Sequence, residues 1–411
     1  MQQYREKAIC VSADLGEWDT EHSVSELEAL CDTDGVEVVA TVIQVMEKRN
    51  SATYIGSGKA REISALAEEM GATLIVVDDD LSGVQTRNLG EIIGVPVVDR
   101  TTLILDIFAN NAVTAEGKLQ VELAQLKYRL PRLMGSGTGL SQQGGGIGTR
   151  GPGETKLETD RRHIRTRIRA LSGKLKDMEA RREVTRRART RSGIPVVALV
   201  GYTNVGKSSL LNTLTDSDIL AEDKLFATLD PTARRLPVAN MQNVILVDTV
   251  GFVSRLPHHL VEAFKSTLAE AQYADLILLV ADASSEDWPE QLNVTKEVLD
   301  ELQCGDTPTL TVFNKCDLTD TAEALPGIAV SAKTGEGLDR LLKEISEKLS
   351  ERVVRAMLLF PFDEIGKAAV LRDRGNIVHE HWEENGLMVQ ASVDRALWPR
   401  YERFQVTPET E

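Results

Sequence analysis

The chain has 411 residues, 42% hydrophobic and 27% charged, a composition that excludes a wholly disordered protein and favours folded domains. No run of 18 apolar residues is present and the first residues are charged, so we expect neither a membrane-spanning helix nor a signal peptide. The cysteines (Cys10, Cys31, Cys304 and Cys316) fit neither a zinc knuckle nor a CxxC redox pair. We therefore expect reduced thiols and a cytoplasmic location.

The net charge of −16 is distributed unevenly along the chain. Residues 150–191 contain 15 Lys/Arg and 6 Asp/Glu, a local charge of +9 on an otherwise acidic protein. A basic segment on an acidic body predicts local contact with a polyanion, although a solvated, highly charged helix has the same composition.

Residues 1–112 have the pattern of a small α/β domain. Apolar, β-branched runs at 71–83 and 94–109 predict strands, and 59–70 predicts a helix.

Two heptad patterns predict an antiparallel helical hairpin over 113–192. The first seam is Leu119, Leu123, Leu126, Leu130 and Leu133, and the second is Ile164, Ile168, Leu171, Leu175 and Met178. The glycine-rich segment 135–153 between them is predicted to be a loop, since glycine costs about 1 kcal/mol per helical position. Each seam can bury the other. We therefore expect an intramolecular hairpin in a monomeric protein. The alternatives are two independent helices joined by a flexible linker, and seams that pair between two chains.

Residues 193–354 alternate strands and helices. The strand-like runs are 194–201, 243–251, 275–284, 307–317 and 327–333. Near-continuous apolar runs favour a mostly parallel sheet with helices on both faces. Residues 355–411 predict a small α+β domain, so the fold class is multidomain α/β.

The strongest functional signal is a phosphate loop that follows a predicted strand and opens a predicted helix. It consists of Gly201, Tyr202, Thr203, Asn204, Val205, Gly206, Lys207 and Ser208, followed by Ser209. Backbone N–H groups and the helix N-terminus favour bound phosphate. We expect Lys207 to bridge the β- and γ-phosphates and Ser208 to bind Mg²⁺.

Motifs at later strand ends indicate a guanine nucleotide. They are Asp248, Thr249, Val250 and Gly251; Asn314, Lys315 and Asp317; and Ser331, Ala332 and Lys333. Asp248 can reach Mg²⁺ through water, and the Gly251 N–H can meet the γ-phosphate. The Asp317 carboxylate can accept hydrogen bonds from guanine N1–H and the exocyclic amine, a pair that adenine does not offer. Together the motifs predict a GTPase that converts GTP and water to GDP and phosphate.

These motifs, with YIGSGK, GSGTGLSQQGGGIGTRGPGETKLETDRR and FATLDPTAR, resemble the HflX family of ribosome-associated GTPases. The G domain itself is similar to translation-factor-related GTPases. The resemblance covers nearly the whole chain and is most specific at 135–162 and 201–252. It implies that switch I is Phe226, Ala227, Thr228, Leu229 and Asp230, with Thr228 closing over Mg²⁺ and the γ-phosphate. The residues alone do not distinguish Thr228 from Thr232.

The resemblance also implies a partner. The N-terminal domain would bind the large ribosomal subunit, and the hairpin loop would reach toward its catalytic centre and contact rRNA. The family is associated with splitting stalled or idle ribosomes under stress, and ATP binding by the N-terminal domain is also attributed to it. The protein could then associate peripherally with membrane through ribosomes.

The predicted rRNA contacts are basic residues of the hairpin. They are Arg150 at the tip and Lys156, Arg161, Arg162 and Arg165 on the second helix. Because only 4% of residues are aromatic, phosphate contacts to structured RNA are favoured over base stacking.

The predicted catalytic groups are Lys207, Thr228 and Gly251, and two neighbouring residues bear on the mechanism. Phe252 follows Gly251 where many small GTPases place a glutamine that orients the attacking water. Our hypothesis is that intrinsic hydrolysis is slow, and that the ribosome supplies the missing group or orders one within the switch regions. Asn204 is typical of GTPases that recruit K⁺ beside the phosphates, which makes K⁺ a second candidate cofactor.

The sequence therefore predicts a Mg²⁺-dependent GTPase switch that binds the large ribosomal subunit. The alternatives are an ATP-driven RNA-remodelling enzyme, a ribosome-assembly factor and a nucleotide-gated protein scaffold.

Overall fold

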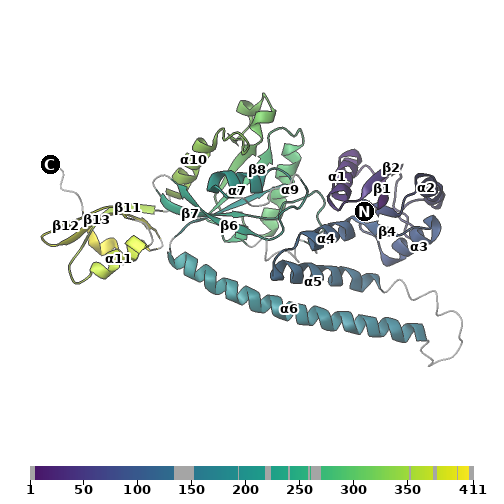
Figure 1. Cartoon of the computed structure of the whole chain (residues 1–411), viewed down its shortest axis with the longest axis horizontal. Coiled ribbons are helices and arrows are strands. Elements are labelled where there is room, and N and C mark those ends of the chain that lie inside the picture. Colours follow the sequence, from purple (N-terminus) through teal and green to yellow (C-terminus); the bar gives the residue numbers. More distant parts are fainter. Residues whose placement is uncertain are drawn as a thin grey trace. The chain divides into compact units, whose positions relative to one another are not determined.

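The computed structural model describes residues 5–133, 152–192, 194–217, 224–238, 241–257, 260, 270–350, 353–373, 377–395 and 397–406. The chain divides into two compact units. The first is Met1–Met178 with Lys224–Leu229 and Ser254–Phe264, and the second is Glu179–Asp223, Asp230–Val253 and Lys265–Glu411. The predicted α/β fold class is confirmed (Figure 1). Among the described residues, no helix is both long and apolar enough to cross a membrane.

A parallel sheet in the order β2-β1-β3-β4 forms the centre of the first unit. The strands are β1 (Lys7–Asp14), β2 (Glu37–Val45), β3 (Leu74–Val77) and β4 (Val97–Asp99), and the helices between and after them are α1 (Thr20–Thr33), α2 (Ser57–Met70), α3 (Gly83–Ile93) and α4 (Arg100–Asn111). After β1 the chain adds β2 on one side and then β3 on the other. The sheet therefore has a topological switch point between β1 and β3.

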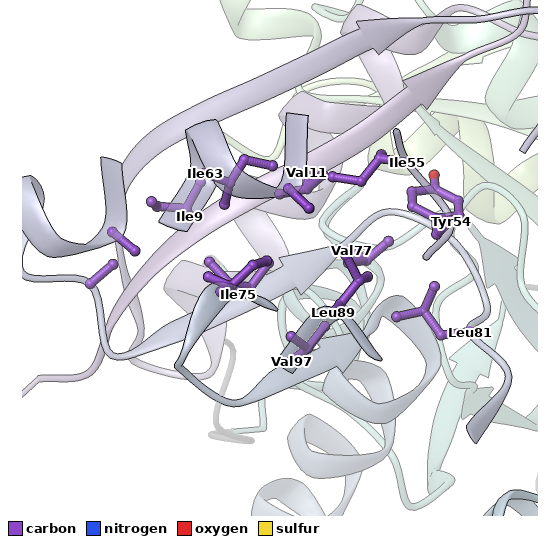
Figure 2. Close-up of a cluster of buried hydrophobic side chains, with 14 of the residues drawn as sticks. Ile9, Val11, Tyr54, Ile55, Ile63, Ile75, Val77, Leu81, Leu89 and Val97 are labelled. Atoms are coloured by element: carbon purple, nitrogen blue, oxygen red, sulfur yellow. The ribbon is translucent and has the colours of Figure 1, made fainter. Parts of the chain in front are cut away.

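The hydrophobic core of this sheet explains why its strands form. Ile9, Ile75 and Val77 are almost fully buried on the strands, and Ile63 and Leu89 cover them from α2 and α3 (Figure 2). The apolar side chains of a strand alternate between the two faces of the sheet, and those of each helix lie on one face of the helix. Packing the helices on the sheet buries both sets together.

The apolar run at 94–109 was predicted as a strand, and that prediction was wrong for most of its length. Only Val97–Asp99 is strand, and α4 begins at Arg100. The Asp99 carboxylate accepts a hydrogen bond from the Thr102 N–H at 2.9 Å and so caps the helix. The apolar residues after Asp99 are buried on a helix packed against α1 and α5. Such a buried helix has the same composition as a buried strand.

The predicted antiparallel hairpin is formed by α5 (Ala115–Arg132) and α6 (Pro152–Ser192), seen side by side in Figure 1. Arg167 of α6 donates to both carboxylate oxygens of Glu122 on α5, at 2.6 and 2.8 Å. This pairing lowers the pKa of Glu122. Leu171 of the predicted seam is fully buried. A second face of α5 joins the hairpin to the α/β domain, because the Tyr128 hydroxyl lies 2.5 Å from the Asp99 carboxylate.

The larger sheet of the second unit has the order β10-β9-β8-β5-β7-β6. Its strands are β5 (Val196–Gly201), β6 (Thr232–Val238), β7 (Met241–Asp248), β8 (Leu276–Asp282), β9 (Thr309–Asn314) and β10 (Ile328–Ala329), and its helices include α7 (Lys207–Thr215), α9 (Trp288–Glu301) and α10 (Leu338–Ser350). Five strands pair in parallel as predicted, and β6 runs antiparallel to β7 at the edge. The strand β6 was not predicted, because its exposed arginines give it little strand signal.

The last part of the chain forms an antiparallel sheet in the order β12-β13-β11-β14. The elements are β11 (Val353–Phe360), α11 (Ile365–Asp373), β12 (Ile377–Glu383), β13 (Gly386–Asp394) and β14 (Gln405–Val406). Short 3₁₀ helices lie at Cys316–Leu318, Ala322–Ala324, Trp398–Arg400 and Glu402–Phe404. The small α+β domain is confirmed.

The buried core of the N-terminal sheet predicts a position-dependent stability effect. Ile75→Ala should lower the free energy of unfolding of the first unit by about 3 kcal/mol, because it removes a fully buried side chain and leaves a cavity. Ile43→Ala is the matched control, since Ile43 is 39% exposed on β2, and it should cost less than about 1 kcal/mol. Hydrogen exchange of the β1 and β3 amides measures both. Equal losses for the two variants would contradict this assignment of the core.

Candidate nucleotide-binding site

The phosphate loop joins the carboxyl end of β5 to the first residue of α7. Gly206 adopts φ 85°, and a Cβ there would lie 2.3 Å from the Asn314 side-chain nitrogen. Only glycine combines that left-handed backbone with that close approach. The loop is thereby held against β9, the strand that ends at Asn314.

Lys207 is buried within the loop that it follows. Its Nζ donates to the carbonyl oxygens of Tyr202 at 2.6 Å and Gly201 at 3.1 Å. Burial lowers the pKa of the amine to about 8, although the nearby Asp248 carboxylate opposes this shift. Carbonyl dipoles stabilise the charged form of a buried amine only partly. A partner with full negative charge, such as a phosphate, stabilises it more.

Ser208 and Asp248 bring two oxygen ligands together. The Ser208 hydroxyl donates to Asp248 Oδ2 at 2.6 Å, and Asp248 is fully buried at the end of β7, next to β5. Hydroxyl and carboxylate oxygens are the hard donors that Mg²⁺ prefers. The residues present therefore fit the predicted magnesium site.

Gly251 lies directly beside Lys207. A Cβ on Gly251 would be 2.9 Å from the Lys207 Nζ and 2.8 Å from the Thr203 Cα, so glycine alone fits. The next residue anchors this stretch, because the Thr203 N–H donates to the Phe252 carbonyl at 2.7 Å and the Phe252 N–H donates to Gly201 O at 3.2 Å. Thr249 donates to the Leu199 carbonyl at 2.7 Å and ties the preceding residues to β5.

The Phe252 side chain belongs to the hydrophobic core, with 1% of its surface exposed. The position where many small GTPases carry a water-orienting glutamine is here a packing position. A glutamine at 252 would bury an amide, so its effect on hydrolysis could not be separated from its effect on stability.

Asn314 connects the phosphate loop to the predicted base site. Its Nδ2 donates to the Val205 carbonyl at 2.9 Å, and its Oδ1 accepts from the Ala332 N–H at 3.0 Å. Ser331 donates to Asp317 Oδ1 at 2.6 Å and orients that carboxylate. The structure thus brings the predicted motifs at the ends of β5, β9 and β10 into one hydrogen-bonded network.

Asp282 is a member of this edge that the sequence analysis missed. It ends β8 and forms an ion pair with Lys315 at 2.7 Å. Its position as the last residue of a predicted strand, in line with Asp248 and Asn314, was the available signal.

Two groups of predicted residues are not placed at this site. Phe226, Ala227, Thr228 and Leu229 belong to the first unit, so the position of Thr228 near Mg²⁺ stays a prediction. Among the predicted RNA contacts, Arg150 and the Lys156 side chain lie outside the described residues. Arg162 and Arg165 are exposed on α6, and Arg161 is partly buried.

Comparisons with known proteins find relatives over nearly the whole chain. Family models match "GTP-binding GTPase N-terminal" at 21–109, "GTP-binding GTPase Middle Region" at 111–189 and "50S ribosome-binding GTPase" at 196–315. The GTPase HflX of Caldanaerobacter subterraneus is 49% identical over 408 residues, which cover 98% of this chain and 94% of the relative. The chain belongs to the HflX family of GTPases.

Another HflX-family relative, the GTPase HflX of Escherichia coli K12, is 41% identical over 405 residues and covers 96% of this chain and 95% of its own. A GTP-binding protein from Sulfolobus solfataricus, solved with GDP, is 25% identical, covers 84% of this chain and 99% of its own, and has a TM-score of 0.44. The predicted family and GTPase activity are confirmed.

The buried Lys207 amine predicts proton uptake on nucleotide binding. With a pKa of about 8 it is charged at pH 7 and largely neutral at pH 8.5, whereas nucleotide phosphates should raise its pKa and keep it charged. GDP binding should therefore take up about 0.1 proton at pH 7 and most of one proton at pH 8.5. Calorimetry in buffers of different ionisation enthalpy measures the uptake. Lys207→Arg keeps its charge at both pH values and should abolish the difference. Equal proton uptake at both pH values in the wild type would contradict the lowered pKa of Lys207.

Proposed function

We propose that this HflX-family GTPase uses its nucleotide state to switch its affinity for the large ribosomal subunit, and that it splits stalled or idle ribosomes under stress. The observation that carries the proposal is a guanine-nucleotide site in the same chain as a long basic hairpin. The "50S ribosome-binding GTPase" description of the family model supports the choice of partner. We also propose the division into parts at 1–112, 113–192, 193–354 and 355–411.

The proposed roles of the site residues follow from their chemistry. Lys207 and the loop N–H groups bind the β- and γ-phosphates, and Asp317 accepts the guanine donors. Ser208 and Thr228 would supply hydroxyl ligands to Mg²⁺, and Asp248 would hold it through water. Mg²⁺, when bound, neutralises charge on the phosphates. Gly251 directs its N–H to the γ-phosphate, where negative charge is stabilised as water attacks.

The switch is proposed to work through Thr228 and Gly251. Both are expected to contact groups that exist only in the GTP state, so hydrolysis removes their partners. The segments that carry them can then change conformation and release the ribosome.

The rRNA contact is proposed for α6 and its glycine-rich tip, 135–153. Arg162 and Arg165 are exposed, and the local charge of +9 suits the phosphates of structured RNA. Glycine backbone at the tip can approach RNA closely because no side chain intervenes.

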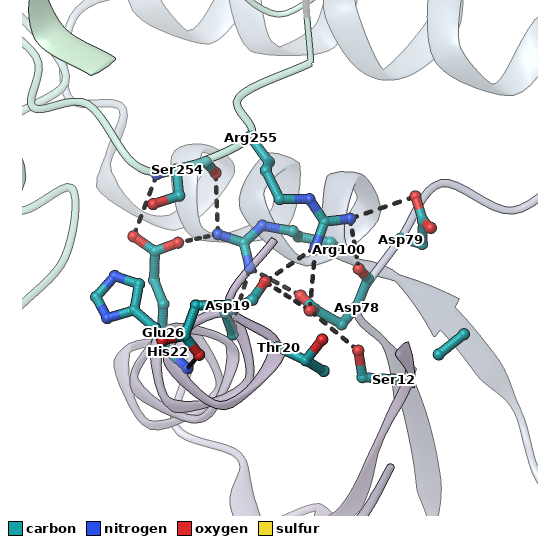
Figure 3. Close-up of polar contacts among 12 residues, drawn as sticks. Ser12, Asp19, Thr20, His22, Glu26, Asp78, Asp79, Arg100, Ser254 and Arg255 are labelled. Atoms are coloured by element: carbon teal, nitrogen blue, oxygen red, sulfur yellow. Dashed lines mark hydrogen bonds and ion pairs between the residues drawn. The ribbon is translucent and has the colours of Figure 1, made fainter. Parts of the chain in front are cut away.

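The ATP-driven alternative is less favoured by the N-terminal sheet. Nucleotides bind such sheets at the carboxyl ends of the strands, and here those ends carry Asp78, Asp79, Asp80 and Asp99. Asp78 already pairs with Arg100 and Arg255, so ion pairs fill the position where a triphosphate would bind (Figure 3). The other two alternatives, an assembly factor and a protein scaffold, are tested by the ribosome experiment below.

Ribosome-stimulated hydrolysis tests the proposal. Purified large subunits should raise the GTP hydrolysis rate strongly, and deletion of 134–153 should blunt the stimulation while leaving the rate without ribosomes unchanged. The charge reversal Arg162→Glu with Arg165→Glu should act in the same direction. It should also make the remaining stimulation depend less on salt, because fewer phosphate contacts release fewer counterions. No stimulation of the intact protein would remove the ribosome as partner and favour the scaffold.

Asn204 supports a role for K⁺. It lies exposed in the loop with φ 60°. We expect faster hydrolysis in KCl than in NaCl of the same ionic strength. Asn204→Gly, which tolerates the same backbone angle but lacks the amide, should reduce the difference. Identical rates in the two salts would contradict K⁺ as a cofactor.

A further inference from the structure

We propose that the Thr203 hydroxyl is a catalytic group of GTP hydrolysis, which orients the attacking water in place of the glutamine that many small GTPases use. The proposal rests on the roles given above to Lys207 and Gly251 at the γ-phosphate. It adds to them a side chain of the phosphate loop, whose contribution has so far been its backbone.

Thr203 is a buried threonine whose hydroxyl has no hydrogen-bond partner. Only 5% of its surface is exposed, and none of the described residues offers its Oγ1 a hydrogen bond. The other buried threonines in the described part of the chain all donate their hydroxyl to an oxygen. Thr249 and Thr295, for example, donate to the carbonyls of Leu199 and Gln291, both at 2.7 Å.

An unpaired hydroxyl in this position needs an explanation. Burial without a hydrogen bond destabilises a fold, whereas valine has the same shape and no polar group to satisfy. The hydroxyl of Thr203 is therefore explained by a partner that the folded chain does not itself supply.

The Thr203 side chain lies at the place where the γ-phosphate is expected. A Cβ on Gly251 would lie 2.8 Å from Thr203 Cγ2 and 2.9 Å from Lys207 Nζ, so the threonine side chain and the lysine amine approach the same point. Lys207 supplies the positive charge for the phosphates, and Gly251 supplies an N–H. A γ-phosphate that meets both groups would also lie beside Thr203.

The backbone holds Thr203 directly beside Phe252, the residue that replaces the glutamine. Tyr202 and Phe252 form a parallel β-bridge. The Thr203 N–H donates to the Phe252 carbonyl at 2.7 Å, and the Phe252 N–H donates to the Gly201 carbonyl at 3.2 Å. These bonds fix the Thr203 side chain next to the position from which other GTPases extend their glutamine, while the Phe252 ring is buried in the core.

A hydroxyl at this place can perform the task of the glutamine amide. It has one proton to donate and lone pairs that accept. Donation to a γ-phosphate oxygen leaves a lone pair that accepts a hydrogen bond from the attacking water and so directs the water oxygen at phosphorus. The bond from the water oxygen to phosphorus forms as the bond from phosphorus to the β–γ bridging oxygen breaks. The water gives one proton to a γ-phosphate oxygen, and the threonine keeps its own.

This role predicts opposite effects on stability and on turnover. Thr203→Val removes an unpaired buried hydroxyl and keeps the shape of the side chain, so the Tm of the nucleotide-free protein should stay the same or rise. Hydrolysis should become slower. A hydroxyl with a structural role would give the reverse, a lower Tm with an unchanged rate.

The test is single-turnover GTP hydrolysis by the full chain without ribosomes. Thr203→Val should lower the rate constant roughly ten- to a hundredfold, because one hydrogen bond to the reacting groups is lost. Affinity for GDP with aluminium fluoride, which mimics the phosphoryl group in transfer, should fall by a similar factor. Affinity for GDP alone should be unchanged, since GDP lacks the γ-phosphate. Thr203→Ser keeps the hydroxyl and should retain most of the rate.

Thr295→Val is the matched control. Thr295 is a buried threonine of α9, 1% exposed, whose hydroxyl bonds within its own helix and takes no part in the site. The same substitution there should leave the hydrolysis rate unchanged and lower the Tm, because it removes a hydrogen bond that is already made.

Several outcomes would overturn the proposal. A folded Thr203→Val protein that hydrolyses GTP at the wild-type rate or faster would do so. An equal loss in Thr203→Ser would show that the methyl group matters and not the hydroxyl, and a matching loss of GDP affinity would show a role in binding alone. Because no arm contains ribosomes, failure here leaves the ribosome proposal untouched, and absence of ribosome stimulation leaves this one untouched.

Discussion

Parallel strands place their carboxyl ends at one edge of a sheet, and both α/β sheets of this protein depend on that constraint. In the larger sheet the ends of β5, β7, β8 and β9 bring together Gly201, Asp248, Asp282 and Asn314, although they are up to 113 residues apart. In the N-terminal sheet the same edge gathers aspartates. One edge suits phosphate and guanine, whereas the other suits a guanidinium.

Buried charge organises both edges. Lys207 and Arg100 are each at least 93% buried, and neither could remain charged without close partners. The partners of Lys207 are carbonyl dipoles and its pKa is lowered, so a bound phosphate would stabilise its charge further. Arg100 has two carboxylates, so its charge is already compensated and it can hold the Ser254 backbone. The first arrangement suits ligand exchange and the second suits a permanent anchor.

Local patterns predicted most of the elements, with instructive exceptions. The phosphate loop was recognisable because glycine, lysine and serine at fixed spacing are required by close backbone approach and phosphate charge. The α4 helix was mistaken for strand because β-branched and aliphatic residues are equally suited to a buried helix. The edge strand β6 was missed because its solvent face is rich in arginine, and Asp282 because a single carboxylate at a strand end carries no motif.

The sequence by itself determined the GTPase family, the nucleotide chemistry and the hairpin, since each depends on residues close together in the chain or on the repeat of a helix. Only the tertiary structure decided what Phe226 and Arg255 contact. Nothing in their neighbourhoods points to Phe108 or Asp78, which lie 118 and 177 residues away. Their positions depend on the switch point of one sheet and the packing of α1 against α4, and such long-range geometry leaves no local pattern in the sequence.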